Sequence, residues 1–245
     1  MSSDMPVVIA HVQPEEARDA FLWHQGFSSA NDHLFPRTLE EYDQFAENRQ
    51  LRCARDDDGN YLGFCYHRQD EETLEWELGG VMVGVQQRGK SLGLILLSVT
   101  LGDLLIDSSP LDEGQWVISH VVEGNPMPRG LLTTHLKFKH RKELVIPGHM
   151  LPGLHTQDDG NVHGDEFEMT VPETLCSLAN WCDDWTGTLR DGTPAEIELR
   201  EPNARTVGRG FQGNGGRARI TDRTFGNALA YNDFGDSPRH ERRNA

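Results

Sequence analysis

The sequence predicts an α/β fold of the mixed α+β kind, and three observations support this class. Short runs rich in β-branched and apolar residues alternate with stretches whose length and apolar spacing suit helices. Two strand-length runs flank residues 56–60, an Asp-rich turn with a glycine that is typical of an antiparallel hairpin. A further extended run leads through a glycine-containing turn straight into residues 92–106, which are apolar almost all round, as in a buried helix.

The individual elements follow from local signals. Pro14, followed by two glutamates, is a favourable first turn of a helix, and Thr38 with Glu41 forms a capping-box pattern ahead of a second helix. Cys53 and Cys65 are placed symmetrically about the hairpin turn, and we expect two reduced thiols there rather than a disulfide. The predicted strands are 7–12, 51–55, 61–68, 73–85, 115–122, 143–146 and 166–171, and the predicted helices are 14–23, 38–49, 92–106 and 129–140.

Charge and composition limit the class of protein. The 245 residues carry a formal net charge of −16, from 39 Asp and Glu against 23 Lys and Arg. Residues 200–245 hold nine Arg against five acids, so a tail of +4 follows a body of −20. A general nucleic-acid binder needs a net basic surface, and we therefore expect no nucleic acid as a partner.

Membrane association and secretion are not expected either. The longest apolar segment, 92–106, is interrupted by polar residues and is too short to span a bilayer. Residues 1–10 lack the pattern of a signal peptide, and the four cysteines show no CxxC spacing. The sequence therefore predicts a cytoplasmic protein.

The turn after Val81-Met82-Val83 has the strongest chemical signal. A buried strand ends there, a glycine-containing turn follows with Arg88 and Lys90, and a helix begins. Free backbone amides, the helix dipole and two cations together favour binding of a phosphate group.

Two known patterns fit this turn. Residues 84–91 match the P-loop pattern GxxxxGK[ST], which would make the chain a nucleotide-binding ATPase or kinase. That function needs a parallel sheet and a downstream strand that ends in an acid for Mg²⁺. The letters Leu104-Leu-Ile-Asp107 lie instead within the predicted helix, and the strand 115–122 ends at Glu123. Residues 88–93, Arg-Gly-Lys-Ser-Leu-Gly, resemble the R/Q-x-x-G-x-G/A acyl-CoA pyrophosphate loop of the GNAT (general control non-repressible-related N-acetyltransferase) superfamily.

The resemblance to the GNAT superfamily covers about residues 5–172, from the opening strand and two helices to Asp165-Glu-Phe-Glu-Met169. It implies a central, mostly antiparallel twisted sheet, splayed at the acyl-CoA cleft and flanked by helices. Residues 173–200 would be an extension that packs on this domain or on the second subunit of a homodimer. Residues 201–245, rich in Gly, Arg and Asn, are predicted to be disordered.

The resemblance implies that acetyl-CoA is a co-substrate. The backbone of Val81 and Val83, with Met82 between them, would pair with the pantetheine arm, and Asn125 would help to hold the cofactor. The pyrophosphate would meet the backbone from residue 88 to 93, which comprises Arg88, Gly89, Lys90, Ser91, Leu92 and Gly93. No metal is expected, because His149, His155, His163 and Asp165 show no known ligand spacing.

Three positions depart from the family pattern. Ser91 stands where the middle glycine of the loop is usual, and Lys137 replaces the glycine of a Leu-Gly-Phe motif. Thr133 lies near the position of the tyrosine that acts as general acid in many members, and it is the residue we assign to that role. Lys137, with Lys139, Arg141 and Lys142, is expected either to contact the 3′-phosphate of the cofactor or to form a solvated helix end.

Glu77 is the candidate general base. It precedes Arg88 by eleven residues, the offset of the catalytic glutamate in histone-type members. Partial burial beside Trp76 and Leu78 would raise the pKa of its carboxyl, as that role requires. A solvated glutamate on a strand face is the alternative. His120, on the strand 115–122, is expected either to face the cleft or to pack in the fold.

The sequence therefore predicts an N-acetyltransferase that moves an acetyl group from acetyl-CoA to a primary amine by direct attack. The acidic body favours a cationic acceptor, either a small molecule or a peptide amine. The P-loop ATPase or kinase is one alternative. A non-catalytic acyl-CoA-binding protein of the same fold is the other, because the tyrosine is missing.

Overall fold

The computed structural model describes residues 7–89, 91–107, 115–170, 173–174, 197–200, 212–214 and 217–219. Its helices are η1 (Pro14–Glu16), α1 (Ala17–Ser28), α2 (Leu39–Glu47), η2 (Val85–Gln87), α3 (Leu92–Asp107), α4 (Pro126–Gly130), η3 (Leu131–His135) and η4 (Gly148–Met150). Its strands are β1 (Val7–His11), β2 (Leu51–Arg55), β3 (Tyr61–Gln69), β4 (Trp76–Val83), β5 (Trp116–Val122), β6 (Lys139–Pro147), β7 (Asn161–Thr170), β8 (Ile197–Arg200), β9 (Gln212–Asn214) and β10 (Arg217–Arg219).

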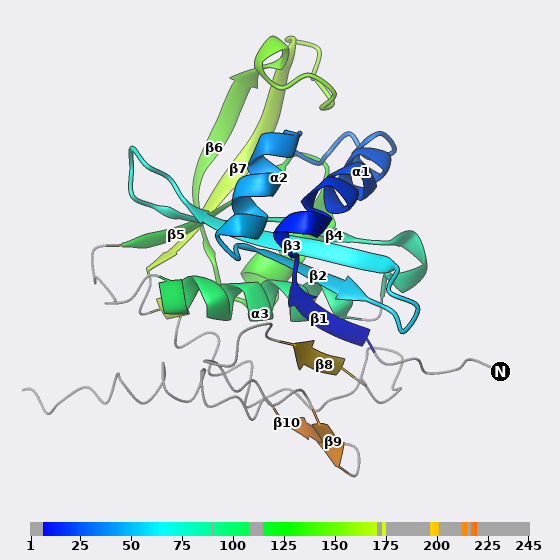
Figure 1. Ribbon diagram of the computed structural model, residues 1–245. Helices are drawn as coiled ribbons and strands as arrows, with labels where there is room; N and C mark the ends of the chain where they lie inside the picture. Colours follow the sequence, from blue (N-terminus) through cyan, green and yellow to red (C-terminus); the bar gives the residue numbers. More distant parts are fainter. Residues whose placement is uncertain are drawn as a thin grey trace, which may run out of the picture.

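Eight strands form one sheet in the order β6-β7-β5-β4-β3-β2-β1-β8 (Figure 1). Neighbouring strands are antiparallel except at two places, where β4 lies parallel to β5 and β1 lies parallel to β8. The mixed, mostly antiparallel sheet confirms the predicted fold class. It also excludes the parallel sheet that a P-loop enzyme would need.

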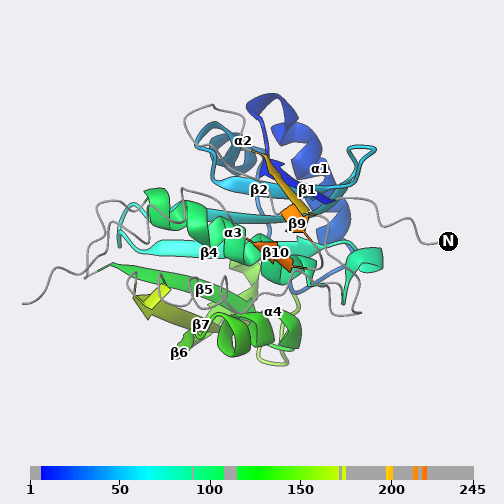
Figure 2. The ribbon, with the colours of Figure 1, turned by 90° about the horizontal axis from the view of Figure 1, so that it is seen from below.

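Helices cover both faces of the sheet. Helices α1 and α2 pack on one face, and α3 lies across β2, β3 and β4 on the other (Figures 1 and 2). Because side chains alternate along a strand, Phe64 and Tyr66 pack under α1 and α2, whereas Cys65 joins the cluster around α3. Cys53 and Cys65 therefore lie on opposite faces, buried and free, as predicted for reduced thiols.

Strands β4 and β5 separate soon after they meet. Only Trp76 with Val117 and Glu77 with Ile118 are paired, although β4 runs on to Val83 and β5 to Val122. On its other side β4 carries a bulge against β3, in which Gly80 adopts a φ of +62°. A bulge increases local twist and bends a strand. Together these features open a wedge-shaped cleft in the middle of the sheet.

The fold differs from the prediction at residues 129–142. The helix predicted at 129–140 is broken into α4 and η3, which ends at His135, and β6 already begins at Lys139. Lys137 has a φ of +66°, the left-handed turn that commonly ends a helix, at the position where the family motif has glycine. The basic run at 139–142 thus belongs to a strand and not to a helix end.

The C-terminal predictions are only partly covered by the structure. Strand β8, from the predicted extension, pairs with β1, and β9 pairs with β10 in a separate small sheet within the segment predicted to be disordered. Lys90 lies outside the described residues. None of the helices that the structure describes is long and apolar enough to cross a membrane.

Gly80→Ala should destabilise the protein more than Gly59→Ala. Both glycines have positive φ, +62° and +83°, so each alanine costs about 1–2 kcal/mol of left-handed strain. A Cβ at residue 80 would lie 2.4 Å from the ring of Tyr66, whereas a Cβ at residue 59 would meet nothing within 4 Å. We expect the Gly80 variant to lose at least about 1 kcal/mol more in urea unfolding because of this overlap. Equal losses would show that the bulge is not tightly packed.

Candidate active site

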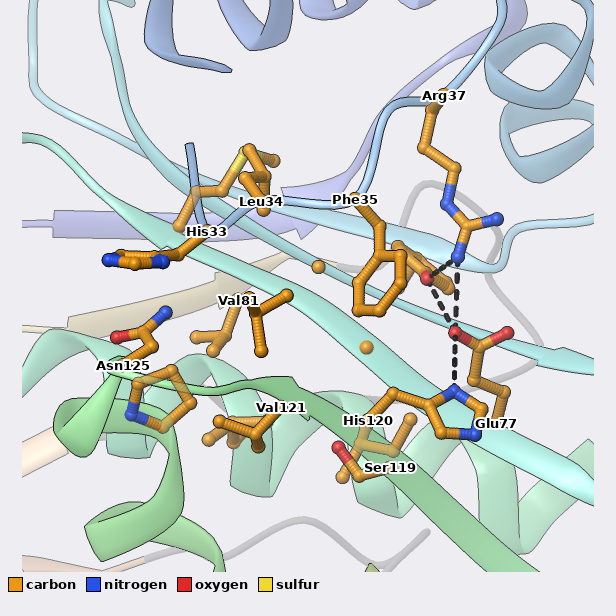
Figure 3. A pocket seen from close by; sticks show the side chains of 18 of the residues that line it. His33, Leu34, Phe35, Arg37, Glu77, Val81, Ser119, His120, Val121 and Asn125 are labelled. Atoms are coloured by element: carbon orange, nitrogen blue, oxygen red, sulfur yellow. Dashed lines mark hydrogen bonds and ion pairs between the residues drawn. The ribbon is translucent and has the colours of Figure 1, made fainter. Parts of the chain in front are cut away.

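The cleft between the parted ends of β4 and β5 forms the main candidate site (Figure 3). Its sides are β4 from Glu77 to Met82 and β5 from Ser119 to Val122. The connection between α1 and α2 closes it on one face, and Asn125 at the start of α4 lies at its end. The separation of the two strands therefore creates the two sides of the cleft.

Glu77 lies at the point where the strands part and is almost fully buried, with a relative exposure of 6%. Its Oε1 accepts hydrogen bonds from the Tyr66 hydroxyl at 2.8 Å and from an Arg37 NH2 group at 3.1 Å. Its Oε2 accepts one from Nε of Arg68 at 2.6 Å. Tyr66, Arg68 and Glu77 share a face because they alternate along adjacent strands.

The structure reverses the pKa predicted for Glu77. Burial alone would raise the pKa of this carboxyl, but the nearby His120, the charges of Arg37 and Arg68, and the Tyr66 hydroxyl outweigh burial and hold the pKa well below its usual range. The prediction of a raised pKa was therefore wrong. The sequence showed the burial but not the arginines that compensate for it. An ionised carboxylate of this kind is a weak proton acceptor.

Arg37 reaches the site because of the local structure that begins α2. The capping box is formed as predicted: Thr38 accepts from the backbone N–H of Glu41 at 3.2 Å, and Glu41 accepts from that of Thr38 at 2.8 Å. The other oxygen of Glu41 accepts a hydrogen bond from Arg37 at 2.9 Å. Arg37 also stacks on the Tyr66 ring at 4.9 Å and donates a hydrogen bond to the Tyr66 hydroxyl. Glu41 thus caps the start of α2 and orients Arg37.

His120 faces the cleft, one of the two outcomes that the sequence allowed. Its Nε2 is 2.9 Å from Oε2 of Glu166 on β7. Its Nδ1 is 3.9 Å from Oε1 of Glu77 (Figure 3). Burial lowers the pKa of His120, but the two carboxylates outweigh burial and raise it above the ordinary 6.5. The bond to Glu166 orients the ring and fixes its Nε2 proton, which leaves Nδ1 toward the cleft.

The turn after β4 has the geometry expected of an anion site. Ser91 has a φ of +62°, the conformation for which a glycine would be usual, and Gly89 has a φ of +79°. Ile95 donates its N–H to the Ser91 carbonyl, so the preceding amides, those of Leu92 and Gly93 included, have no acceptor within α3. Arg88 is exposed, with its guanidinium 5.9 Å above the Phe27 ring. An anion could therefore reach the amides and the cation from solvent.

The other predicted cofactor residues fall into two groups. Val81, Met82 and Asn125 line the cleft, whereas Val83 packs against the cluster around α3. Beyond Glu77, the edge of β4 that faces β5 has no strand partner among the described residues, as binding of an added extended chain would require.

Two other predicted groups are not brought to the cleft. Thr133 is not among the described lining residues, and its hydroxyl donates to the Arg129 carbonyl at 2.9 Å. Arg141 pairs with Glu75 at 2.7 Å, and Arg141 and Lys142 both lie near Glu166, so acids neutralise this basic cluster along β6.

Sequence reasoning missed several residues of the site. Tyr66, Arg68 and Glu166 lie on predicted strands, so the alternation of side chains between the two faces of a strand could have identified them. Arg37 lies in an irregular connection and has no periodic signal. Among the described residues no group of three or more His, Cys, Asp and Glu could hold a metal ion.

Solved structures share this fold. A GNAT-family acetyltransferase from Streptococcus pneumoniae matches 67% of this chain and 98% of its own, with a TM-score of 0.51 and 15% identity. A putative acetyltransferase from Salmonella typhimurium, solved with its cofactor acetyl-CoA, matches 67% of this chain and 94% of its own, with a TM-score of 0.51 and 11% identity. A chain of the NatC complex bound to Gag peptide and CoA matches 68% of this chain and 99% of its own, with a TM-score of 0.52 and 13% identity.

These likenesses show that the chain has the GNAT fold predicted for it. No model of a protein family matches the sequence, and a search of curated proteins also finds no match. The P-loop alternative does not have the structure that it needs, because Asp107 ends α3 instead of a strand.

Glu77→Gln should destabilise the protein at neutral pH by about 3 kcal/mol, because it leaves buried positive charge without its partner. The folded-state pKa of Glu77 is lowered, so its stabilisation is complete above the unfolded pKa, about 4.3, and is lost as the pH falls below it. The stability difference between wild type and variant should therefore shrink from pH 5 downward in urea unfolding. The exposed Glu72→Gln is the control, with no change expected at neutral pH. A difference that stays constant into acid would show that Glu77 is not held ionised.

Proposed function

We propose that the protein is an acetyl-CoA-dependent N-acetyltransferase that acts on a primary amine. The observation that carries this proposal is the cleft itself. It lies along the end of β4, which leads to a helix start whose free amides suit an anion, and it contains an oriented histidine that bonds to Glu166 near the point where β4 and β5 part. An acyl donor with a phosphate-bearing handle fits the first end, and proton transfer from an amine fits the second.

The residues present suit acetyl-CoA. The turn from Arg88 to Gly93 would hold the pyrophosphate through backbone amides and the charge of Arg88, with Lys90 beside it in the sequence. The unpaired edge of β4 around Val81 and Met82 would bind the pantetheine arm, and Asn125 would lie against it from the start of α4. When bound, acetyl-CoA supplies an acetyl thioester and a thiolate leaving group.

His120 is proposed as the general base, in place of Glu77. A base works best when its pKa lies near the working pH, which suits a histidine and does not suit a carboxylate that arginines hold ionised. The proton of the attacking amine passes to Nδ1, and Glu166 stabilises the imidazolium through Nε2. Glu77, 3.9 Å from Nδ1, would orient the amine as a hydrogen-bond acceptor.

The leaving thiolate must also receive a proton. Thr133 stays our prediction for protonation of the leaving thiolate, on the family resemblance, although its hydroxyl bonds to its own helix in the described structure. A protein that binds acetyl-CoA and acetylates no amine would be the non-catalytic alternative.

The described part of the cleft offers little free negative charge that would select a cationic acceptor. The net charge of −16 attracts cations in general. However, Glu77 is the only carboxylate among the described residues that line the cleft, and two arginines already neutralise it. We therefore propose a primary amine that is selected by shape and hydrogen bonding, and not by a free acidic pocket.

Arg88→Glu should weaken acetyl-CoA binding by about tenfold or more, because it replaces a cation at the pyrophosphate turn with an anion. Thermal shift against acetyl-CoA concentration gives the affinity, since a ligand that binds only the native state raises the melting temperature. Arg18→Glu, an equally exposed site on α1, is the matched control and should bind like wild type. A larger shift with ATP–Mg²⁺ than with acetyl-CoA would overturn the proposal.

His120→Gln should lower kcat by about 10²–10⁴-fold and abolish the acid limb of the kcat–pH profile at saturating amine. In wild type that limb should rise through a pKa above 6.5, because His120 must be neutral to accept a proton. Glu166→Gln removes an anion that favours the imidazolium, so its limb should move to lower pH. If the limb is unchanged in both variants, His120 is not the base.

A further inference from the structure

The amine end of the cleft has a roof. Residues 29–38, which connect α1 to α2, cross over it, and His33, Leu34, Phe35 and Arg37 from this connection line the cavity (Figure 3). Below the roof lie Tyr66, Glu77 and His120, and α1 forms the rear wall with His24. We call this roofed end the chamber.

The hairpin of β6 and β7 fixes the roof in place. Phe35 packs with Leu151 and Leu154 of the hairpin tip and with Val122 of β5 in one hydrophobic cluster. The backbone N–H of His155 donates to the Asp32 carbonyl at 3.0 Å. Figure 1 shows the tip of this hairpin curving over toward the helices.

The opposite side of the roof is also held. A Cβ at Gly124 would lie 3.5 Å from the His33 ring, so this imidazole rests against the chain that leaves β5. An extended peptide needs an open groove to run along the site, and here the contacts of Phe35 and His33 hold residues 29–38 over the cavity. The geometry therefore favours an acceptor that enters the chamber whole.

His24 is an unusual wall residue. It is buried, with 3% exposure, and neither ring nitrogen has a hydrogen-bond partner among the described residues. Burial, helped by the charge of Arg37, lowers its pKa to about 4, so the ring is neutral and offers one donor and one acceptor. Leaving such a group unsatisfied costs on the order of 1–3 kcal/mol. The Nε of Arg37 is likewise buried without a partner among these residues.

Resting on the proposed function, we propose that the acceptor is a small free amine with an oxygen-bearing second group, and not an amine of a protein or peptide. The second group, a hydroxyl, carbonyl or carboxylate, accepts a hydrogen bond from His24, while the amine lies between Glu77 and His120. Amino alcohols and amino acids are the two sources of this chemistry. Both fit a chamber that is closed by residues 29–38 and has its unused hydrogen-bonding groups on the wall formed by α1.

Acetylation assays with matched amines test the proposal. The wild-type protein with acetyl-CoA would be given amino acids, amino alcohols, plain alkylamines of equal length, and an unstructured peptide with the same amine. We expect kcat/KM to be at least about tenfold higher for an oxygen-bearing amine than for the alkylamine, and the peptide to be about 100-fold poorer than the free amine. If amino acids have a higher kcat/KM than amino alcohols, the second group is a carboxylate, and if amino alcohols have the higher value, it is a hydroxyl. Peptide acetylation at a similar rate would overturn this proposal alone, whereas no turnover with any amine would overturn the proposed function as well.

Variants of His24 and of the roof separate binding from folding. His24→Leu should raise the melting temperature, because an unsatisfied polar group is removed, and should abolish the preference for the oxygen-bearing amine. His24→Gln keeps a donor and an acceptor and should retain part of that preference. Selectivity that survives in His24→Leu would overturn the role of His24.

Leu154→Ala removes a contact that holds the roof and should raise peptide acetylation at least about tenfold relative to the free amine. Leu74→Ala, at an exposed leucine on another turn, is the matched control and should leave the ratio unchanged. An unchanged ratio in both variants would show that the roof does not exclude peptides.

Discussion

The structure depends on the early separation of β4 from β5. Two paired positions keep the strands in one sheet, and the bulge at Gly80 turns β4 away before more pairs can form. Unpaired backbone groups are costly in a closed core, so a sheet that opens in its middle must expose those groups to solvent or to a ligand. The turn after β4, the buried charges and the roof are all arranged around that opening.

Buried charge is the second consequence of the opening. Glu77 is close to the bottom of the wedge, where water cannot solvate it well, and the fold supplies Arg37, Arg68 and Tyr66 instead. This compensation changes the chemistry that each group can perform. The carboxylate becomes a fixed charge, and the two carboxylates beside His120 raise the pKa of this histidine above its ordinary value.

Much of the fold could be predicted from local patterns, and the site only in part. The hairpin, the capping box of α2 and the buried α3 each have strong short-range signals, and they form where predicted. The break after His135 was missed because a basic run fits an exposed strand and a helix end equally well, and only pairing with the acids of β7 decides between them. The pKa of Glu77 could not be predicted, because it depends on Arg37, forty residues away along the chain.

Arg37 links the roof of the chamber to its floor. It lies in the connection that roofs the chamber, and its guanidinium pairs with Glu77 on the floor, with only 12% of the side chain exposed. Lifting the roof would separate these opposite charges and return water to both. The ion pair thus works as a latch: it pairs the charges of Arg37 and Glu77 while the roof is closed, and an acceptor that enters must supply contacts that replace those lost on opening. Because the pair is buried, salt would loosen this latch far less than it would loosen an ion pair on the surface.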